Sequence, residues 1–440
     1  MDVLTAGDSE HQQRRAAGAL GELGIRAGDR MVLSLPGSTA LVSVVLGALR
    51  SGVVPVMLDP HLTPVERDQV LANCQPSLVV DDHVGLTRLL NSEPGPLADS
   101  PLARPMHYTS GTTGHRKGVW SGVLDDEAAS ALLLEERELW RFEPSDVHLV
   151  LSALHHSAPL RFAAGTLMAG GAIAVLPSFG PREAIEALAH VRPSTTFCAP
   201  AHLQRIFAAV DAGAVLPSLA QVRLLAHAGA PCPPPLKERT VDTLPVGSVW
   251  EFYGSTEGQF TACSPEDSVA RPGSVGRPRP GRELSLDADG TIWCRVPAHA
   301  RFSYWRDPEK TARAWRGDAF TVGDLGRLDD EGFLYLDGRR EDLLITGGVN
   351  VYPLEVELAL RGLPGVQDVA VFGCPDEQWG QRVCAAYVGE VSEIDLRTWA
   401  AQRLSPPKRP KSYYRLEALP HTVSGKVRRT ALAKDLGLEG

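Results

Sequence analysis

Apolar runs of strand length alternate with helix-length segments along the first part of this chain, and this alternation limits the folds open to it. Strands are predicted at residues 30–35 and 53–58, with a buried helix at 39–49 between them. Thr63 and Glu66 then fit the capping box of a further helix. Strand and helix in regular succession predict a parallel sheet covered by helices.

The alternation continues further along the chain and then changes. Strands are expected at residues 147–154, 172–176, 195–198, 222–226 and 248–252, and helices at residues 160–169, 181–190 and 202–210. From about residue 270, short β segments between Pro and Gly turns predict a small β subdomain, and the C-terminal part has its own α+β pattern. A chain of 440 residues is too long for one ordinary core. We therefore expect an α/β fold with a large N-terminal domain, residues 1–338, and a small α+β domain, residues 339–440.

Composition and charge argue against several classes of protein. The net charge of −9 argues against a nucleic-acid partner. The polar, charged N-terminal stretch lacks the apolar region of a signal peptide, and no apolar run reaches membrane-spanning length. The seven cysteines include no CxxC pair and no cluster with zinc spacing, so we expect reduced thiols. These features predict a cytoplasmic protein with no membrane partner.

The segment YTSGTTGHRKG, residues 108–118, is rich in glycine and hydroxyl residues. Glycines let the backbone turn sharply and expose N–H groups, the hydroxyls add donors, and Lys117 adds a positive charge. This is the chemistry of a loop that wraps a polyphosphate, although neither the Walker nor the Rossmann spacing is present. Taken alone, the segment could also be a flexible surface loop. Its candidate phosphate contacts are Thr109, Ser110, Gly111, Thr112, Thr113, Gly114 and Lys117.

The segment resembles the phosphate-binding loop of the adenylate-forming superfamily, which includes acyl-CoA synthetases, aryl-CoA ligases, luciferases and peptide-synthetase adenylation domains. The family pattern is roughly [YF][TS]SG[TS][TS]GxPKG, and this chain departs from it at Arg116, where proline is usual. Further motifs follow in family order from about residue 30 to about residue 430. The resemblance implies a large domain of parallel sheets flanked by helices and a small mobile C-terminal domain.

The sequence Tyr253-Gly-Ser-Thr-Glu257 follows a predicted strand and matches the YG[SM]TE motif of that superfamily. Alone, it would be a turn with a solvated glutamate. Tyr253 offers a flat face for an adenine ring, and Thr256 offers a hydroxyl to a phosphate. Glu257 offers the kind of oxygen ligand that Mg²⁺ prefers. The resemblance implies catalytic roles for Thr256 and Glu257, and nucleotide contacts from Gly254 and Ser255.

Asp324 lies in a Gly-Asp-Leu-Gly turn between predicted strands. Its carboxylate could accept both ribose hydroxyls of a nucleotide, although an isolated aspartate of this kind is more often a simple turn residue. In family order it resembles the ribose-binding aspartate, and Arg339 resembles the arginine that also holds the ribose. The resemblance also places Tyr335 beside the nucleotide. Glu341 falls at the hinge position, where the superfamily usually has Asp or Lys.

Lys426 lies in the segment PHTVSGKVRR, residues 420–429. Taken alone, this segment would be a solvated basic tail. It resembles the PxTxSGK motif, whose lysine bridges the substrate carboxylate and the α-phosphate. Negative charge builds on the phosphoryl oxygens as a carboxylate attacks the α-phosphorus, and a pre-positioned ammonium group stabilises that charge. We therefore expect Lys426 to be catalytic.

The GGVNVYP segment, residues 347–353, resembles the loop that shapes the pantetheine tunnel of acyl-CoA synthetases. The alternative is a plain hairpin before a helix. The resemblance implies contacts to coenzyme A from Gly347, Gly348 and Asn350.

The acyl pocket is expected near His156, which by family position gates it and takes part in catalysis. Histidines at strand ends are more often structural. No aspartate stands where amino-acid-activating relatives bind an α-amine, which argues against an amino-acid substrate. The GAP segment, residues 229–231, resembles the lining of the adenine and acyl pockets, although alone it would be a strand-end turn. The expected pocket residues are His156, Ser157, Ala158, Ala199, Ala228 and Gly229, and Gly229, Ala230 and Pro231 are expected beside the nucleotide.

The motifs together predict an ATP-dependent carboxylic acid–CoA ligase that works through an acyl-adenylate, with ATP, Mg²⁺ and coenzyme A at the site. Transfer of the acyl group to a carrier protein or to an amine is an alternative. A catalytically silent nucleotide-binding protein is an alternative of another class. The partner is a small carboxylic acid whose identity the sequence leaves open, and the chain is expected to be a monomer or a homodimer.

Overall fold

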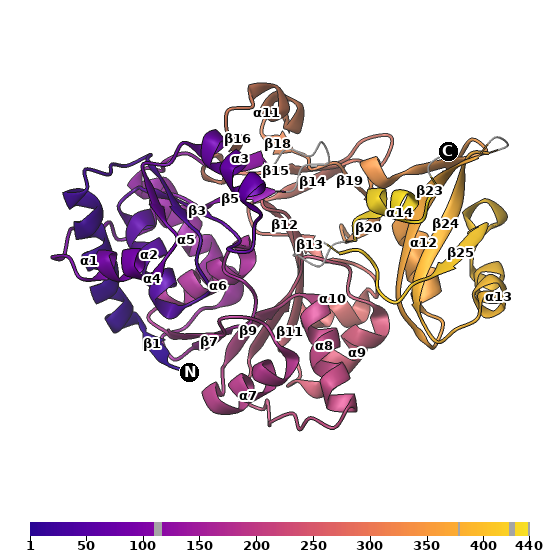
Figure 1. Cartoon of the computed structure of the whole chain (residues 1–440), viewed down its shortest axis with the longest axis horizontal. Coiled ribbons are helices and arrows are strands. Elements are labelled where there is room, and N and C mark those ends of the chain that lie inside the picture. Colours follow the sequence, from indigo (N-terminus) through magenta and orange to yellow (C-terminus); the bar gives the residue numbers. More distant parts are fainter. Residues whose placement is uncertain (110–116, 377–378, 422–426, 439–440) are drawn as a thin grey trace.

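The protein is a large domain beside a small one. The structure, a computed structural model, describes residues 1–109, 117–376, 379–421 and 427–438. Figure 1 shows the large N-terminal domain from indigo through magenta to salmon, and the small C-terminal domain in orange and yellow. The predicted α/β class, with a large and a small domain, is confirmed. The boundary at residue 338 stays a prediction.

The first sheet of the large domain has six strands with a parallel centre. Strands β4, β2, β3 and β5 run parallel, and β6 and β16 are antiparallel at one edge. The parallel sheet that the sequence predicts is therefore mixed. In order, the strands are β16 (Ser303–Tyr304), β6 (Lys117–Trp120), β5 (Met106–Thr109), β3 (Val54–Met57), β2 (Arg30–Leu33) and β4 (Leu78–Val80).

The second sheet has eight strands and is also mixed. Its five central strands are parallel, and antiparallel strands lie at both edges. In order, the strands are β1 (Val3–Thr5), β8 (Ala172–Val175), β7 (Val147–Val150), β9 (Thr195–Cys198), β10 (Leu224–His227), β11 (Val249–Gly254), β12 (Gln259–Cys263) and β13 (Arg277–Pro278).

Helices fill the space between the two sheets and cover the second one. Helix α2 contacts β3 of the first sheet and β8 of the second, so it lies between them, and α1 and α6 pack against it. Helices α7 and α8 pack against β7 and β9, and α9 packs on α8. The bounds are α1 (Ala6–Glu22), α2 (Thr39–Arg50), α3 (Pro64–Cys74), α4 (His83–Leu90), α5 (Asp126–Trp140), α6 (Ser157–Met168), α7 (Pro181–Val191), α8 (Pro200–Asp211) and α9 (Pro234–Thr243).

The helix start at Thr63 confirms the capping box. The backbone N–H of Glu66 donates to Thr63 Oγ1 at 3.3 Å, and the N–H of Thr63 donates to Glu66 Oε2 at 3.1 Å. Sequence patterns did not predict α1, α4 or α5. Helix α1 is polar over most of its length, and only the packing of Ala16, Ala19 and Leu20 against neighbouring helices reveals its inner face.

A β subdomain completes the large domain. It contains the antiparallel sheet β14-β15-β18-β17 and the hairpin β19-β20. The bounds are α10 (Pro265–Ala270), β14 (Glu283–Leu286), β15 (Ile292–Arg295), η1 (Ala298–Ala300), α11 (Pro308–Ala314), β17 (Trp315–Arg316), β18 (Ala319–Phe320), β19 (Asp324–Leu328) and β20 (Leu334–Arg339).

The small domain is a five-stranded sheet with helices packed on it. Strand β24 lies at its centre, between β23 on one side and β21 and β25 on the other. The chain beyond residue 428, expected to be a tail, forms helix α14, which packs on β23. The bounds are η2 (Arg340–Asp342), β21 (Leu344–Thr346), β22 (Val349–Val351), α12 (Pro353–Arg361), β23 (Val366–Asp376), β24 (Gly380–Gly389), α13 (Glu393–Arg403), η3 (Pro406–Lys408), β25 (Ser412–Arg415) and α14 (Arg429–Asp435).

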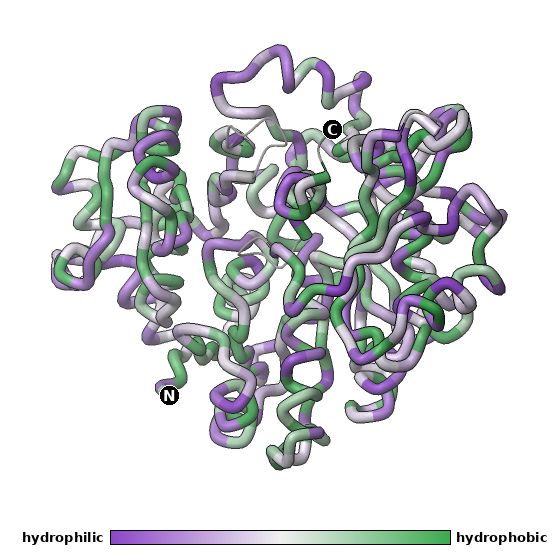
Figure 2. The backbone as a smooth tube through the Cα atoms, turned by 45° about the vertical axis from the view of Figure 1, so that its right-hand side comes forward, coloured by the Kyte–Doolittle hydropathy of each residue, from purple (hydrophilic) through white to green (hydrophobic). Residues whose placement is uncertain are grey.

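Hydrophobic and hydrophilic residues are interleaved along both domains, as Figure 2 shows. Within the described part of the chain, no helix combines the length and the apolar character that crossing a membrane requires. All seven cysteines are free thiols, and six of them are buried.

Candidate active site

The predicted phosphate loop joins two paired strands. Thr109 ends β5 opposite Lys117 at the start of β6, so the two ends of the loop are held side by side. Lys117 Nζ forms an ion pair with Asp307, the N-cap residue of α11. The hydrogen bond from this ammonium group makes the largest contribution to lowering the pKa of Asp307. The predicted contacts Ser110, Gly111, Thr112, Thr113 and Gly114, together with Arg116 and the side chain of Thr109, lie outside the described residues.

The YGSTE motif forms the end of a strand and the turn of a hairpin. Tyr253 and Gly254 belong to β11, which corrects the expectation that the motif follows the strand. Pairing with β12 extends β11 by these residues, because Gly254 lies opposite Gln259. The N–H of Ser255 donates to the carbonyl oxygen of Gly258 at 2.8 Å, which closes the turn.

Asp324 lies between Tyr253 and Arg339. The hydroxyl of Tyr253 donates to Asp324 Oδ2 at 2.6 Å, and Arg339 Nε lies 3.0 Å from Asp324 Oδ1. Asp324 begins β19 and pairs with Arg339 of β20, so it is a strand residue and not the predicted turn residue. Burial and the Asp324 carboxylate raise the pKa of Tyr253. The fold therefore unites three predicted nucleotide residues in one cluster, through a hydrogen bond and an ion pair.

Tyr335 lies on the same hairpin but makes other contacts. Its hydroxyl donates to Asp329 Oδ2 at 3.4 Å, and the Arg327 guanidinium lies over its ring, 4.0 Å from the centroid. These contacts do not join it to the cluster around Asp324.

Glu257 is a buried carboxylate, and the hydroxyl of Tyr304 donates to Glu257 Oε1 at 2.9 Å. Among the described residues, no group of three or more His, Cys, Asp or Glu side chains could hold a metal ion. Mg²⁺ usually binds through one or two carboxylates together with substrate phosphates and water. One carboxylate at Glu257 fits that mode, with most ligands supplied by ATP.

His156 is the N-cap residue of α6, and its ring lies against the His155 ring at an interplanar angle of 58°, with centroids 4.4 Å apart. Burial lowers the pKa of His156 to about 3, so its ring is neutral near pH 7. His107 Nδ1 lies 2.9 Å from the carbonyl oxygen of His155, which connects this pair to β5. A neutral His156 ring can gate a pocket or form hydrogen bonds, but it does not supply a permanent positive charge.

The other predicted pocket residues do not all lie together. Ser157 lines a partly open cavity of about 160 Å³ between α5, α6 and the 255–259 turn, and Ser255 and Thr256 line it as well. We call this the inner cavity. His156, Ala199 and Gly229 are not among its lining residues, and Ala158 and Ala228 instead pack in a hydrophobic cluster with Phe162 and Phe252. The exposed segment Gly229-Ala230-Pro231 follows β10, and Gly229 has a φ of 96°.

The predicted coenzyme A loop is a tight hairpin between β21 and β22. Gly347 and Gly348 form its two-residue turn with φ values of 56° and 78°, which glycine adopts without strain. Asn350 is exposed and pairs with Ile345. Glu341 lies in the short η2 turn between the domains, and Lys426 lies outside the described residues.

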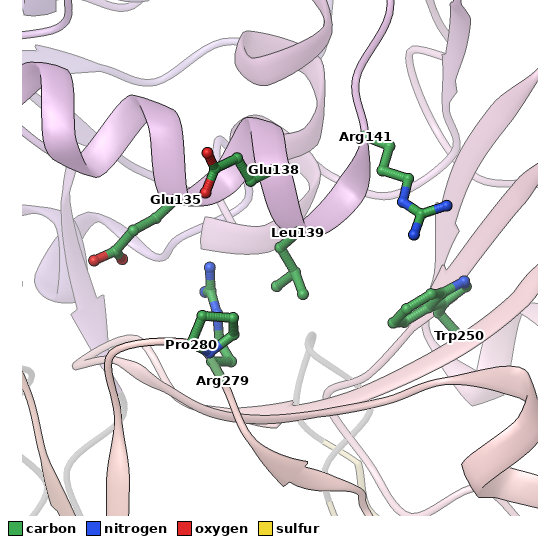
Figure 3. Close-up of a pocket in the computed structure, with 7 residues that line it drawn as sticks. All are labelled: Glu135, Glu138, Leu139, Arg141, Trp250, Arg279 and Pro280. Carbon is green, nitrogen blue, oxygen red and sulfur yellow. The ribbon is translucent and has the colours of Figure 1, made fainter.

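A further pocket, of about 260 Å³, lies away from the motifs. Figure 3 shows Glu135, Glu138 and Leu139 of α5, with Arg279 and Pro280 below the helix and Trp250 to the right. None of the residues that the sequence singled out lines it.

Tyr304 and Asp307, which the sequence patterns missed, carry no local motif and reach the site only through the fold.

Comparison with known proteins identifies related sequences and structures. The family model described as AMP-binding enzyme matches residues 2–97 and 98–297, and the AMP-binding enzyme C-terminal domain matches residues 355–426. The 2-succinylbenzoate–CoA ligase of Geobacillus kaustophilus is 35% identical over 74% of this chain and 68% of its own. A feruloyl-CoA synthase of Amycolatopsis sp is 30% identical, covering 99% of this chain and 94% of its own. A fatty acid–[acyl-carrier-protein] ligase of Streptomyces coeruleorubidus is 28% identical, covering 98% and 91%.

Two solved structures share the fold over nearly the whole chain. ATP-bound MatB from Rhodopseudomonas palustris superposes with a TM-score of 0.85 at 27% identity, covering 98% of this chain and 93% of its own. The o-succinylbenzoate CoA synthetase of Bacillus subtilis, in complex with its acyl-adenylate intermediate, has a TM-score of 0.84 at 25% identity, covering 97% and 92%.

Proposed function

Because the chain belongs to the family of AMP-binding enzymes, we propose that it is an AMP-forming acid–thiol ligase that joins a carboxylic acid to coenzyme A. In the first step a carboxylate oxygen attacks the α-phosphorus of ATP, and the bond to pyrophosphate breaks. In the second step the thiol sulfur attacks the acyl carbon, the bond to AMP breaks, and acyl-CoA leaves. Both steps balance without an oxidant or a reductant.

The cluster of Tyr253, Asp324 and Arg339 is the observation that carries this proposal. Residues far apart in the chain meet at a carboxylate that could accept the ribose hydroxyls once Tyr253 and Arg339 rearrange. Glu257 lies four residues from Tyr253 on the adjoining turn. Acceptors for a sugar and a ligand for Mg²⁺ therefore come from one hairpin region, as a nucleotide site requires.

In the proposed first step, positive groups gather on the phosphates. Lys117 would break its ion pair with Asp307 and bind the phosphates. The backbone N–H groups and hydroxyls of residues 109–114 would bind them as well. Lys426 would stabilise charge on the α-phosphate, and Thr256 would donate to it. Bound Mg²⁺ would neutralise phosphate charge, and Glu257 would hold it. The neutral ring of His156 would border the acyl group.

In the proposed second step the small domain, residues 339–440, rotates relative to residues 1–338 about a hinge at Glu341. This hinge motion would withdraw Lys426 and bring the hairpin of Gly347, Gly348 and Asn350 to the acyl-adenylate with the thiol.

The acceptor is the least constrained part of the proposal. A carrier-protein thiol is the second candidate, because one relative is an acyl-carrier-protein ligase. Acyl-adenylate offered separately with coenzyme A, a phosphopantetheinylated carrier protein or an amine would distinguish the three acceptors. Acid-dependent release of pyrophosphate excludes a silent nucleotide-binding protein.

The decisive variant is Lys426→Ala. Loss of one charge stabiliser is expected to slow acid-dependent pyrophosphate release roughly 10²–10³-fold. Thioester formation from supplied acyl-adenylate should stay close to wild type, because Lys426 has left the site by then. Lys434→Ala, an exposed lysine of α14, is the matched control and should change neither step. Equal losses in both half-reactions would contradict the two-arrangement proposal.

A further inference from the structure

Several charged side chains line the inner cavity. Four of its lining residues are arginines, namely Arg104, Arg161, Arg279 and Arg282, and one is a glutamate, Glu136. The rest of its wall includes apolar side chains such as Leu132, Leu160 and Met168. Apolar walls with a few convergent polar groups are typical of a small-molecule site.

Glu136 and the neighbouring Glu135, which lies outside the cavity lining, are already paired with arginines. Glu136 Oε1 lies 3.0 Å from Arg279 Nη2, and Glu136 Oε2 lies 3.2 Å from Arg161 Nε. Glu135 Oε2 lies 2.8 Å from Arg282 Nη2, and Glu135 Oε1 lies 2.6 Å from His299 Nε2. Burial alone would raise the pKa of Glu136, but Arg279 and Arg161 outweigh it and lower the pKa to about 2. Two carboxylates, of which only Glu136 lines the cavity, therefore pair with three of the four guanidinium groups.

Arg104 has no carboxylate partner among the described residues. Arg104 Nη2 donates to the carbonyl oxygen of Arg301 at 3.1 Å. In the described part of the chain, Arg104 Nε is buried without a hydrogen-bond partner, and so is Arg161 Nη2. Burial and the neighbouring Arg282 and Arg161 lower the pKa of Arg104 to about 10, so it still carries its charge near pH 7. An unpaired charge in such a place costs stability and marks a candidate functional site.

The cavity reaches the residues that the proposed function uses. Thr256 of the YGSTE turn and Ser157 at the start of α6 line it, and so do His107 and Val119 of the two strands that carry the phosphate loop. Its volume of about 160 Å³ is below the roughly 300–1,000 Å³ of sites for drug-sized ligands. It therefore suits one end of a small substrate beside the adenylation site.

We propose that the inner cavity receives a second anionic group of the acid substrate, so that the preferred substrates are short dicarboxylic acids. Arg104 and Arg161 bind the distal carboxylate through their unpartnered N–H groups, while the other carboxylate reacts with ATP. This inference rests on the proposed function, because it names the substrate class of the same site.

The test compares acids of matched length that differ only in the distal group, such as glutarate with pentanoate, adipate with hexanoate, and 3-(4-carboxyphenyl)propionate with 3-(4-methylphenyl)propionate. The purified full chain is assayed for acid-dependent pyrophosphate release. We expect kcat/KM to favour the dicarboxylate by roughly 10- to 100-fold, the range of a charge-assisted hydrogen bond. Arg104→Met should bring that ratio close to one, and Arg104→Lys should keep part of it.

Controls separate this subsite from the phosphates of ATP or coenzyme A. The KM for ATP and for coenzyme A should be the same in Arg104→Met as in wild type. Arg295→Met, at an exposed arginine that pairs with Glu283, should keep the wild-type preference. The melting temperature of Arg104→Met should not fall, because the variant removes a poorly paired charge.

The outcomes distinguish the two proposals. Monocarboxylates that react as well as their dicarboxylate partners in the wild type would overturn the inference and leave the ligase function standing. A rise in the KM for ATP in Arg104→Met would also overturn it, since Arg104 would then serve the nucleotide. If no acid of either kind released pyrophosphate, the proposed function itself would be overturned.

Discussion

Several histidines of the large domain are kept neutral by burial. His148 is fully buried, its Nδ1 lies 2.9 Å from Thr195 Oγ1, and its ring stacks on Phe162. Burial lowers the pKa of His148 to about 3 and that of His107 to about 4. In the folded state these rings bind fewer protons than in the unfolded chain between about pH 3 and the ordinary pKa of about 6.5. Their contribution to stability is complete above that value and declines as the pH falls.

At the residue scale we therefore expect acid to destabilise the protein through His148. Between pH 7.5 and pH 5 this residue alone should lower the free energy of unfolding by about 2 kcal/mol. His148→Gln should flatten the pH dependence by that amount in urea unfolding curves. His83→Gln, at an exposed position, is the control. An unchanged slope in His148→Gln would show that the ring is not held neutral.

At the element scale, the packing of α1 depends on glycines at its contacts. A Cβ added to Gly18 would lie 1.8 Å from the carbonyl oxygen of Glu93, and one added to Gly47 of α2 would lie 2.6 Å from that of Gln13. Both obstacles are backbone atoms, which cannot turn aside as a side chain can. Gly21, in the last turn of the same helix, has no atom within 4 Å of an added Cβ.

The pair Gly18→Ala and Gly21→Ala tests this contact. Gly18→Ala should destabilise the protein by ~1–3 kcal/mol, because α1 must move away from the chain at Glu93. Gly21→Ala should be neutral or stabilise it by up to about 1 kcal/mol through better helix propensity. Thermal or urea unfolding of the two variants measures the difference. Equal effects at both positions would mean that α1 does not pack as the structure has it.

At the scale of the whole molecule, few side-chain hydrogen bonds join the two domains within the described part of the chain. Gln204 Nε2 of α8 donates to the carbonyl oxygen of Gln367 in β23 at 3.3 Å, and Arg340 Nη2 donates to Thr291 Oγ1 at 2.7 Å. Figure 1 shows the small domain to one side of the large one, with β20 leading into it. A small, polar contact of this kind is compatible with rotation between domains.

Joining exposed positions 204 and 367 should stop the proposed rotation. With Gln204→Cys and Gln367→Cys linked by a short bis-maleimide, we expect one half-reaction to continue and turnover of acid to acyl-CoA to be lost. Asp211→Cys with Arg239→Cys, an exposed pair within the large domain, is the matched control and should keep turnover after the same treatment. Full turnover with the 204–367 link in place would exclude a rotation that each cycle requires.

The strands, the helices with clear periodicity and the order of the motifs could be predicted from the sequence, because hydrophobic spacing, caps and glycine turns act over a few residues. Helix α1 could not, because its inner face is defined only by the helices against it. Tyr253 and Asp324 are 71 residues apart, and Lys117 and Asp307 are 190 apart. Only the folded chain brings these partners together. It also places Arg104 beside other arginines, which the sequence could not predict because the charges around a buried group depend on all of its neighbours in space.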